Sequence, residues 1–251
     1  MVFRDEEKRG NPRKGSVSIA GAGKVAGGEY HTVKISGSGR VEGDLVAEEL
    51  RISGAGKVEG TTRAREIVVS GAGRFEGPVE AETFQCSGAC KVEAGLQAKE
   101  ARIAGTFKVE GNVKAHYFRS GGVLKVEGDL EAEVVSLAGI VTVTGLLSAD
   151  RVEMKLEGTS YVREIGGGVI EVRRTRHRGL LEELGIPFFR RQGTLQAVSI
   201  EGDEVRLEGT QAKLVRGKVV SIGPGCRVER VEYEESLEVD PDAHVGEEVK
   251  G

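Results

Sequence analysis

The 251-residue chain contains no tryptophan, two methionines and few aromatic residues, which make up only 4% of it. This composition cannot fill the wide core of a globular domain, and it favours a thin core of small aliphatic side chains. Three cysteines do not suggest a disulfide framework. The net charge of −4 and the pI of about 5.8 give no basic footprint, so we expect no nucleic-acid partner.

The chain also lacks an apolar run of about 18 residues, so the sequence predicts no transmembrane helix. No signal peptide opens the sequence, and a cytoplasmic location is the expectation. A metal site at Cys86 and Cys90 would need two further ligands, and the surrounding sequence offers none. We therefore expect both thiols to lie in or near the core.

Glycine, in contrast, is abundant at 38 residues, and it recurs within a repeat. Three consecutive copies of one 17-residue unit occupy residues 34–50, 51–67 and 68–84, reading KISGSGRVEGDLVAEEL, RISGAGKVEGTTRAREI and VVSGAGRFEGPVEAETF. Self-similarity at a short fixed period indicates a solenoid. Within each copy, apolar or glycine positions alternate with polar ones, which is the period of a β-strand. Because 17 is odd, each copy needs one corner or bulge to restore the alternation.

Stacking the copies places equivalent residues above one another and predicts three inward-facing columns. The first holds Val25, Val41, Val58, Phe75, Val92, Val109, Val126 and Val143. The second holds Ile35, Ile52, Val69, Cys86, Ile103, Ser120 and Leu137, and the third holds Ala47, Ala64, Ala81, Ala98, Ala115, Ala132 and Ala149. The fold class is therefore all-β, a parallel β-helix solenoid of about 17 residues per coil. Right-handed winding is expected, because right-handed crossovers dominate between parallel strands.

The repeat also divides the chain into regions. We expect a flexible charged tail at 1–16, a parallel β-helix at 17–172, a basic and apolar insertion at 173–193, continuing coils at 194–236 and an acidic tail at 237–251. The run VRLEGT at 205–210 repeats MKLEGT at 154–159 with an offset of 51 residues, three times the unit. The insertion therefore either leaves one long stack intact or replaces part of a coil.

Two charged columns are predicted on the outside of the coils. The basic column is Arg40, Lys57, Arg74, Lys91, Lys108 and Lys125, and the acidic column is Glu42, Glu59, Glu76, Glu93, Glu110 and Glu127. Neighbouring columns of opposite sign offset the repulsion within each column. The alternative is a pair of catalytic carboxylates, as in polysaccharide-cleaving enzymes. We prefer a solvated face, because a catalytic pair would interrupt the repeat.

Tandem units of the form ISGxG[KR]VEGx[LV]xA resemble the bactofilins, the polymer-forming cytoskeletal proteins of bacteria. The resemblance is close over residues 17–152, and the 194–236 region is similar to the C-terminal part of a longer Gram-positive-type branch. It implies a right-handed parallel β-helix that polymerises end to end without nucleotide, often at the membrane. Such filaments scaffold cell-shape or envelope enzymes. The insertion and the second β-region depart from the pattern of the short members.

The leading hypothesis is therefore a non-enzymatic scaffold whose first partner is itself, with no cofactor and no catalytic, cofactor-binding or metal-binding residue. The proposed self-assembly interface is Val17, Ile19 and Val25, because the first coil presents an open strand edge. A membrane or partner segment is formed by Leu180, Leu181, Leu184, Ile186, Phe188, Phe189, Arg190 and Arg191. That segment would either cover the stack or bind an anionic membrane surface or a cell-envelope or cell-shape protein.

Two alternatives differ in class from a scaffold. A β-helix enzyme could act on a polysaccharide or transfer an acyl group, and its general base would come from His31, His116, His177 or His244. No Ser/His/Asp or Cys/His spacing accompanies these imidazoles. The other alternative is an adaptor that docks one envelope or cell-shape protein without polymerising.

Overall fold

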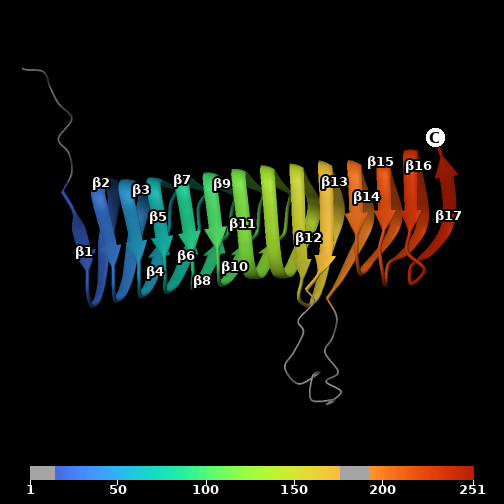
Figure 1. Ribbon diagram of the computed structural model, residues 1–251. Coiled ribbons are helices and arrows are strands. Elements are labelled where there is room, and N and C mark those ends of the chain that lie inside the picture. The colour runs from blue at the N-terminus through green and yellow to red at the C-terminus, as the bar shows by residue number, and fades with distance from the viewer. Residues whose placement is uncertain (1–14, 176–192) are drawn as a thin grey trace, which may run out of the picture.

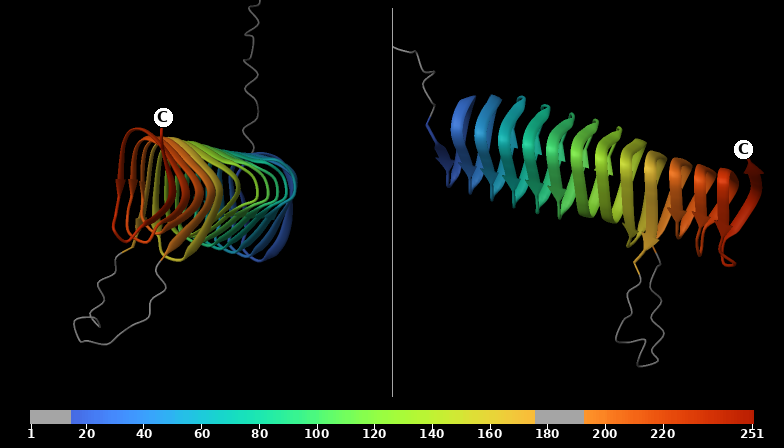
Figure 2. Two further views of the ribbon diagram at one scale, coloured as in Figure 1. Left: turned by 90° about the vertical axis from the view of Figure 1, so that its right-hand side faces the viewer. Right: turned by 45° about the horizontal axis from the view of Figure 1, so that its top comes forward.

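A computed structural model describes residues 15–175 and 193–251 of the chain. In this described part all regular structure is β-strand, and the strands form one parallel sheet wound into a solenoid of about 13 turns with about 17 residues per turn. Figures 1 and 2 show the turns stacked along one axis, with β1 at one end and β17 at the other. The predicted fold class is confirmed.

The strands follow the chain along the stack (Figure 1). Their bounds are β1 (Val17–Ile19), β2 (Ala22–Ile35), β3 (Ser38–Ile52), β4 (Ala55–Val58), β5 (Thr62–Val69), β6 (Ala72–Phe75), β7 (Val79–Cys86), β8 (Ala89–Val92), β9 (Leu96–Ile103), β10 (Thr106–Val109), β11 (Val113–Val126), β12 (Leu130–Leu156), β13 (Thr159–Arg174), β14 (Thr194–Leu207), β15 (Thr210–Ile222), β16 (Arg227–Val239) and β17 (His244–Lys250). Each strand pairs in parallel with the strand one turn away, as between Val92 and Val109.

The first two predicted columns form the centre of the core. From Val41 to Val143 the valine column is fully buried, and Val25 at its start is half-buried. The second column is buried throughout, including Ser120, whose hydroxyl has no hydrogen-bond partner within the described residues. The few aromatic residues add to this core, because the ring of Phe84 lies 6.2 Å from that of Phe75 and 5.4 Å from that of Phe107.

The alanine column lies at the margin of the core. Ala81, Ala115 and Ala132 are half-buried, and the column forms the floor of a shallow external groove of about 690 Å³. Three further columns, which the repeat contains but which we did not predict, also lie in the interior. They are Leu45, Thr62, Val79, Leu96, Val113, Leu130 and Leu147; Leu50, Ile67, Phe84, Ala101, Phe118, Val135 and Val152; and Cys90, Phe107, Leu124 and Val141.

Glycine ladders explain the SGxG motif. A β-carbon added at Gly71 would lie 2.1 Å from the carbonyl oxygen of Gly54, and one added at Gly88 would lie 2.0 Å from that of Gly71. No heavy atom can approach so closely, so the corner tolerates only glycine. The same contact recurs from Gly37 to Gly139 at each turn. These glycines allow the backbones of successive turns to come into contact.

The stack continues across the insertion. Strand β13 pairs directly with β14, and Val172 pairs with Leu207 on the far side of residues 176–192. One long stack is therefore present. The spacing of 51 residues is not three turns, because Met154 pairs with Val172 and Val172 with Leu207, which makes two turns. The sequence echo misled us because the turn from Met154 to Val172 has 18 residues, and the next turn contains the insertion and spans 35 residues, to Leu207.

The C-terminal range 237–251 was predicted to be an acidic tail, and this prediction is wrong. Strand β16 runs to Val239, and β17 pairs with it in parallel from His244 to Lys250. The acidic residues conceal an alternation in which Leu237, Val239 and Val245 pack against the core. This region therefore forms the last turn of the solenoid.

Candidate functional site: the two open faces and the charged wall

The N-terminal face of the stack consists of residues 17–31. Within the described chain, β1 pairs only with the end of β2, and the first part of β2 pairs only with β3. The three residues predicted as an interface all lie here: Ile19 is buried at 8% exposure, and Val17 and Val25 are half-buried. Backbone N–H and C=O groups along such an unpaired edge can accept another strand.

The C-terminal face consists of residues 234–250. Strand β17 pairs on one side with β16, and within the described residues nothing pairs with its other side. Leu237, Val239 and Val245 are half-buried on this face. Each is the last member of an inward column, and the member of that column one turn earlier is buried. The face carries seven acidic residues and one lysine, which gives a formal charge of −6.

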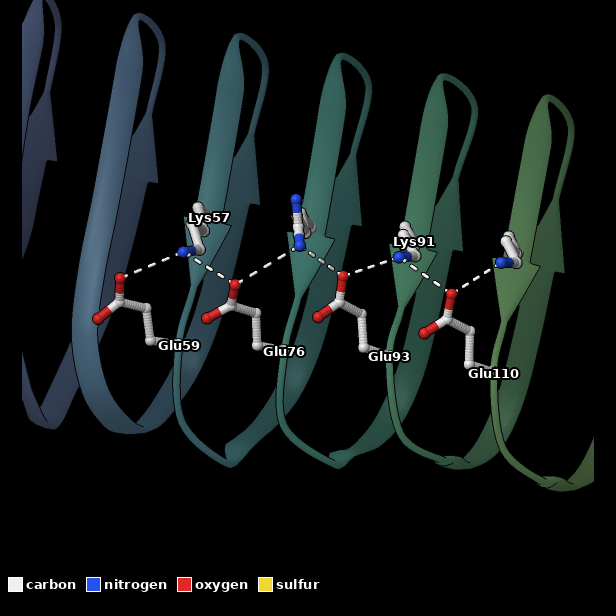
Figure 3. Close-up of polar contacts among 8 residues, drawn as sticks. Lys57, Glu59, Glu76, Lys91, Glu93 and Glu110 are labelled. Atoms are coloured by element: carbon white, nitrogen blue, oxygen red, sulfur yellow. Dashed lines mark hydrogen bonds and ion pairs between the residues drawn. The ribbon is translucent and has the colours of Figure 1, made fainter.

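A continuous ladder of ion pairs lines one wall of the turns from Arg40 to Glu127, and Figure 3 shows its middle part. The Nζ atom of Lys57 lies 3.3 Å from Oε1 of Glu59 in its own turn and 2.8 Å from Oε1 of Glu76 in the next. The zigzag passes through Arg74, Lys91 and Lys108 and ends at Lys125 beside Glu127. The predicted charged columns are therefore paired both within turns and between them.

The ladder lowers the pKa of three carboxyl groups, those of Glu93, Glu110 and Glu127. Hydrogen bonds from Lys108 and Lys91 lower the pKa of Glu110 to about 2. A hydrogen bond from Lys91 lowers the pKa of Glu93, and one from Lys125 lowers that of Glu127. A catalytic acid of a glycoside hydrolase needs a raised pKa, because it must hold a proton near neutral pH. These three carboxyls have the opposite property, and their ion pairs stabilise the wall.

On a second wall, repulsion between like charges in successive turns is avoided in a different way. Here each column alternates in sign along the stack, so that Lys99 pairs with Glu82 at 2.9 Å and Arg63 with Glu80 at 2.8 Å. The imidazoles belong to the same arrangement. Nδ1 of His31 lies 3.1 Å from Glu48, and Nδ1 of His116 lies 3.0 Å from Glu133.

These imidazoles are more than half exposed. His31 and His116 are 85 residues apart, which places them five turns from each other along the stack. His244 begins β17, and His177 lies outside the described residues. The described imidazoles are not brought together with a nucleophile or with one another. The enzyme hypothesis gains no geometric support from them.

The three cysteines are all buried and free. A hydrogen bond joins the thiols of Cys86 and Cys90, and it raises the pKa of Cys90 together with burial. Burial also raises the pKa of Cys226, whose sulfur accepts a hydrogen bond from the Thr210 amide at 3.4 Å. In the described part of the chain no group of three or more His, Cys, Asp or Glu side chains could hold a metal ion.

The predicted membrane or partner segment lies outside the described residues, because Leu180, Leu181, Leu184, Ile186, Phe188, Phe189, Arg190 and Arg191 all fall within 176–192. The residues that flank it are held by Arg174. Its backbone N–H donates to Glu208 at 3.0 Å, and its Nε donates to the Gly193 carbonyl at 3.3 Å. Thr175 and Gly193, which border the segment, lie on the side of the stack, several turns before the C-terminal face.

Across residues 15–175 and 193–251, no helix has the length and apolar character needed to cross a membrane.

Comparison with known proteins gives two relatives from Bacillus subtilis (strain 168). The chain is 45% identical over 91 residues to the uncharacterized protein YhbF, covering 36% of this chain and 35% of the relative. It is 44% identical over 97 residues to the uncharacterized protein YhbE, covering 38% and 39%. The similarity thus spans little more than a third of each protein. No family model and no solved structure matches the chain.

Proposed function

We propose that this protein is a non-enzymatic structural scaffold that assembles end to end into polymers without bound nucleotide. The observation that carries the proposal is the contrast between the ends of the stack and its walls. Within the described residues, each end offers a strand edge without a partner beside half-buried apolar columns. Two walls of the earlier turns, in contrast, carry rows of paired charges.

Association through the ends would be favourable for two reasons. It would remove the half-buried Val25 and Val245 from water, which contributes through the hydrophobic effect. It would also pair backbone groups that have no strand partner within residues 15–175 and 193–251. The resemblance of the tandem units to the bactofilins supports the same assembly and adds a bacterial cytoskeletal role. A cytoplasmic polymer, peripheral at the inner face of the cell membrane, is part of this proposal.

Light scattering and electron microscopy test the proposal directly. We expect the full chain at tens of micromolar to form long oligomers or filaments about one solenoid wide, in buffer without ATP or GTP. Val25→Glu combined with Val245→Glu should leave a folded monomer, because both faces then carry an added charge. A wild-type protein that stays monomeric under these conditions contradicts the proposal and favours an adaptor that docks a different partner.

A further inference from the structure

The wall that carries the ion-pair ladder loses its charge next to residues 176–192. Over the three turns that follow Lys125 and Glu127, the strand pairing continues both columns of the ladder. The first column continues as Thr142, Tyr161 and Gln196, and the second as Thr144, Arg163 and Val198. Arg163 is the one charged residue among these six, and its Nε lies 3.2 Å from Oε1 of Glu164. The ladder thus ends although its columns continue.

Large apolar side chains lie exposed on this uncharged stretch. They are Val123, Ile140, Tyr161 and Val198, with exposed fractions of 43%, 44%, 38% and 39%. Val123 pairs with Ile140, and Tyr161 and Val198 each follow one turn later and two residues further along the strand. The four residues therefore form a diagonal band across the wall, which we call the apolar patch. Single exposed apolar residues are common, whereas a contiguous group marks an interaction surface.

The apolar patch lies beside the point at which residues 176–192 rejoin the solenoid. Thr194 begins β14 and pairs with Thr159 of the preceding turn on this wall. Ile140 is one turn further, so about 10 Å separates it from Thr194. Phe189 precedes Thr194 by five residues, and an extended chain of five residues spans up to about 17 Å. The tether therefore allows Phe189 to reach Ile140.

The composition of residues 176–192 is complementary to the apolar patch. The segment holds Leu180, Leu181, Leu184, Ile186, Phe188 and Phe189. Contact with the patch would remove apolar surface from water on both sides. The segment also carries four arginines against two glutamates, and the lysine column that would repel them has ended on this stretch. A short flexible tether gives an effective concentration in the millimolar range, so even a weak contact within the chain is populated.

We propose that residues 176–192 dock on the apolar patch of their own chain, with Phe188 and Phe189 against Val123 and Ile140. The patch is then an internal docking surface, and its occupant is neither a lipid surface nor a second protein. This docking accounts for the loss of charge after Lys125, because a ladder of ion pairs would lose its water beneath the segment.

Disulfide formation within the chain tests the docking. Thr142→Cys with Arg190→Cys places one thiol beside the patch and one next to the phenylalanines. Arg227→Cys with Arg190→Cys is the matched control, because Thr142 and Arg227 lie two turns from Gln196 in opposite directions along one column. The native cysteines are buried. With oxidised glutathione and micromolar protein, we expect the first pair to close about tenfold faster than the control, since docking raises the local thiol concentration.

The phenylalanines should account for this difference. Adding Phe188→Ser and Phe189→Ser should bring the two rates within about twofold of each other. Equal rates in the two starting variants overturn the proposal, and so does a fast rate that survives both serines. Covalent dimers on denaturing gels would show that the segment docks on another copy, which also overturns it. Circular dichroism checks that each variant keeps its β-structure.

Tryptophan fluorescence gives a second measurement, since the chain has no tryptophan of its own. In Phe189→Trp we expect emission at shorter wavelength than that of an exposed indole, because the ring is held against Val123 and Ile140. Replacing both aliphatic residues with serine should return the emission to that of an exposed indole. Val46→Ser is the matched control, because Val46 is 44% exposed on a different wall, and it should leave the emission unchanged.

A membrane as the occupant gives a different result. The indole of Phe189→Trp is then exposed in buffer, and its emission shifts only when vesicles of phosphatidylglycerol and phosphatidylcholine are added. That outcome overturns the proposal in favour of an anionic lipid surface. Emission of an exposed indole both with and without vesicles overturns it as well. A blue-shifted emission that survives the serine substitutions at Val123 and Ile140 places the segment elsewhere and has the same consequence.

Discussion

The ammonium group of Lys91 lies 3.0 Å from Oε1 of Glu110, a residue of the next turn. The same Nζ atom is 2.8 Å from Glu93 within its own turn. The four basic side chains of this wall from Lys57 to Lys108 are each shared between two carboxylates in this way. A column of like charges, which would repel if it stood alone, becomes part of a connected and attractive array.

The first prediction concerns pH. The folded-state pKa of Glu110 is about 2, below its ordinary value of 4.5, so its interactions stabilise the protein fully above about pH 4.5. This contribution is lost as the pH falls through the folded value, about 2. Glu110→Gln should therefore lower the melting temperature at pH 7. The difference from wild type should shrink below pH 4.5 and vanish near pH 2 in melts followed by circular dichroism.

Glu157→Gln is the matched control for this experiment, since Glu157 is an exposed carboxyl outside the ladder. It should show almost no difference from wild type at any pH. A Glu110→Gln difference that persists unchanged at pH 2 would mean that the loss comes from packing and not from charge.

The second prediction concerns the glycine ladder. A methyl group at Gly88 would lie 2.0 Å from the Gly71 carbonyl oxygen, so the two turns must separate. We expect Gly88→Ala to cost about 3 kcal/mol, the upper end of the ordinary range for single substitutions. Gly21 begins the same ladder, and its β-carbon would meet nothing within 4 Å. Gly21→Ala should therefore leave the denaturation midpoint nearly unchanged when it is measured in the monomeric variant Val25→Glu, Val245→Glu. Equal losses of stability at Gly21 and Gly88 would show that the contact between Gly88 and the Gly71 carbonyl is not the cause.

The third prediction tests the inward valine column. Val92 is fully buried, so Val92→Asp places a carboxyl group in an apolar core without a partner. The cost should reach about 4 kcal/mol. Val46 is 44% exposed on the outside of β3, and Val46→Asp should cost less than about 1 kcal/mol. Urea denaturation measures both, and the column assignment is wrong if Val92→Asp unfolds with the wild type.

The fourth prediction concerns thiol chemistry. Thiolates are the reactive form, and the raised pKa values of Cys90 and Cys226 keep these thiols protonated near neutral pH. Cys86 is 1% exposed and is protected by burial. We expect less than one thiol to react with a chromogenic disulfide reagent in the native state and all three to react in denaturant. Rapid native labelling of one cysteine would show that the wall opens around it.

The repeat predicted the interior because its two strongest columns combine fixed spacing with large apolar side chains. Val58 and Ile52 could be assigned on those grounds alone. The alanine column was less well defined, because a small side chain fits both a core and the floor of a groove. At the C-terminus the acidic residues around Val239 concealed the alternation, since charge dominates composition even where every second side chain points inward.

The faces illustrate a different limit of sequence reasoning. An open first turn could be expected from where the repeat begins, and Val17, Ile19 and Val25 do lie there. The C-terminal partner could not be expected, because β17 was hidden in a predicted tail. The outline of the end turns depends on register, and register shifts such as the one between Gly217 and Val219 leave no clear mark in the sequence.

The glycine ladder has a consequence for evolution. Every boundary between turns from Gly37 to Gly139 uses the same backbone contact, so neighbouring turns are interchangeable at their surfaces. Unequal recombination that removes or duplicates 17 residues in this region would rejoin equivalent edges and keep the hydrogen bonding in step. The length of the rod can thus change by whole increments of about 4.8 Å while both terminal faces stay the same.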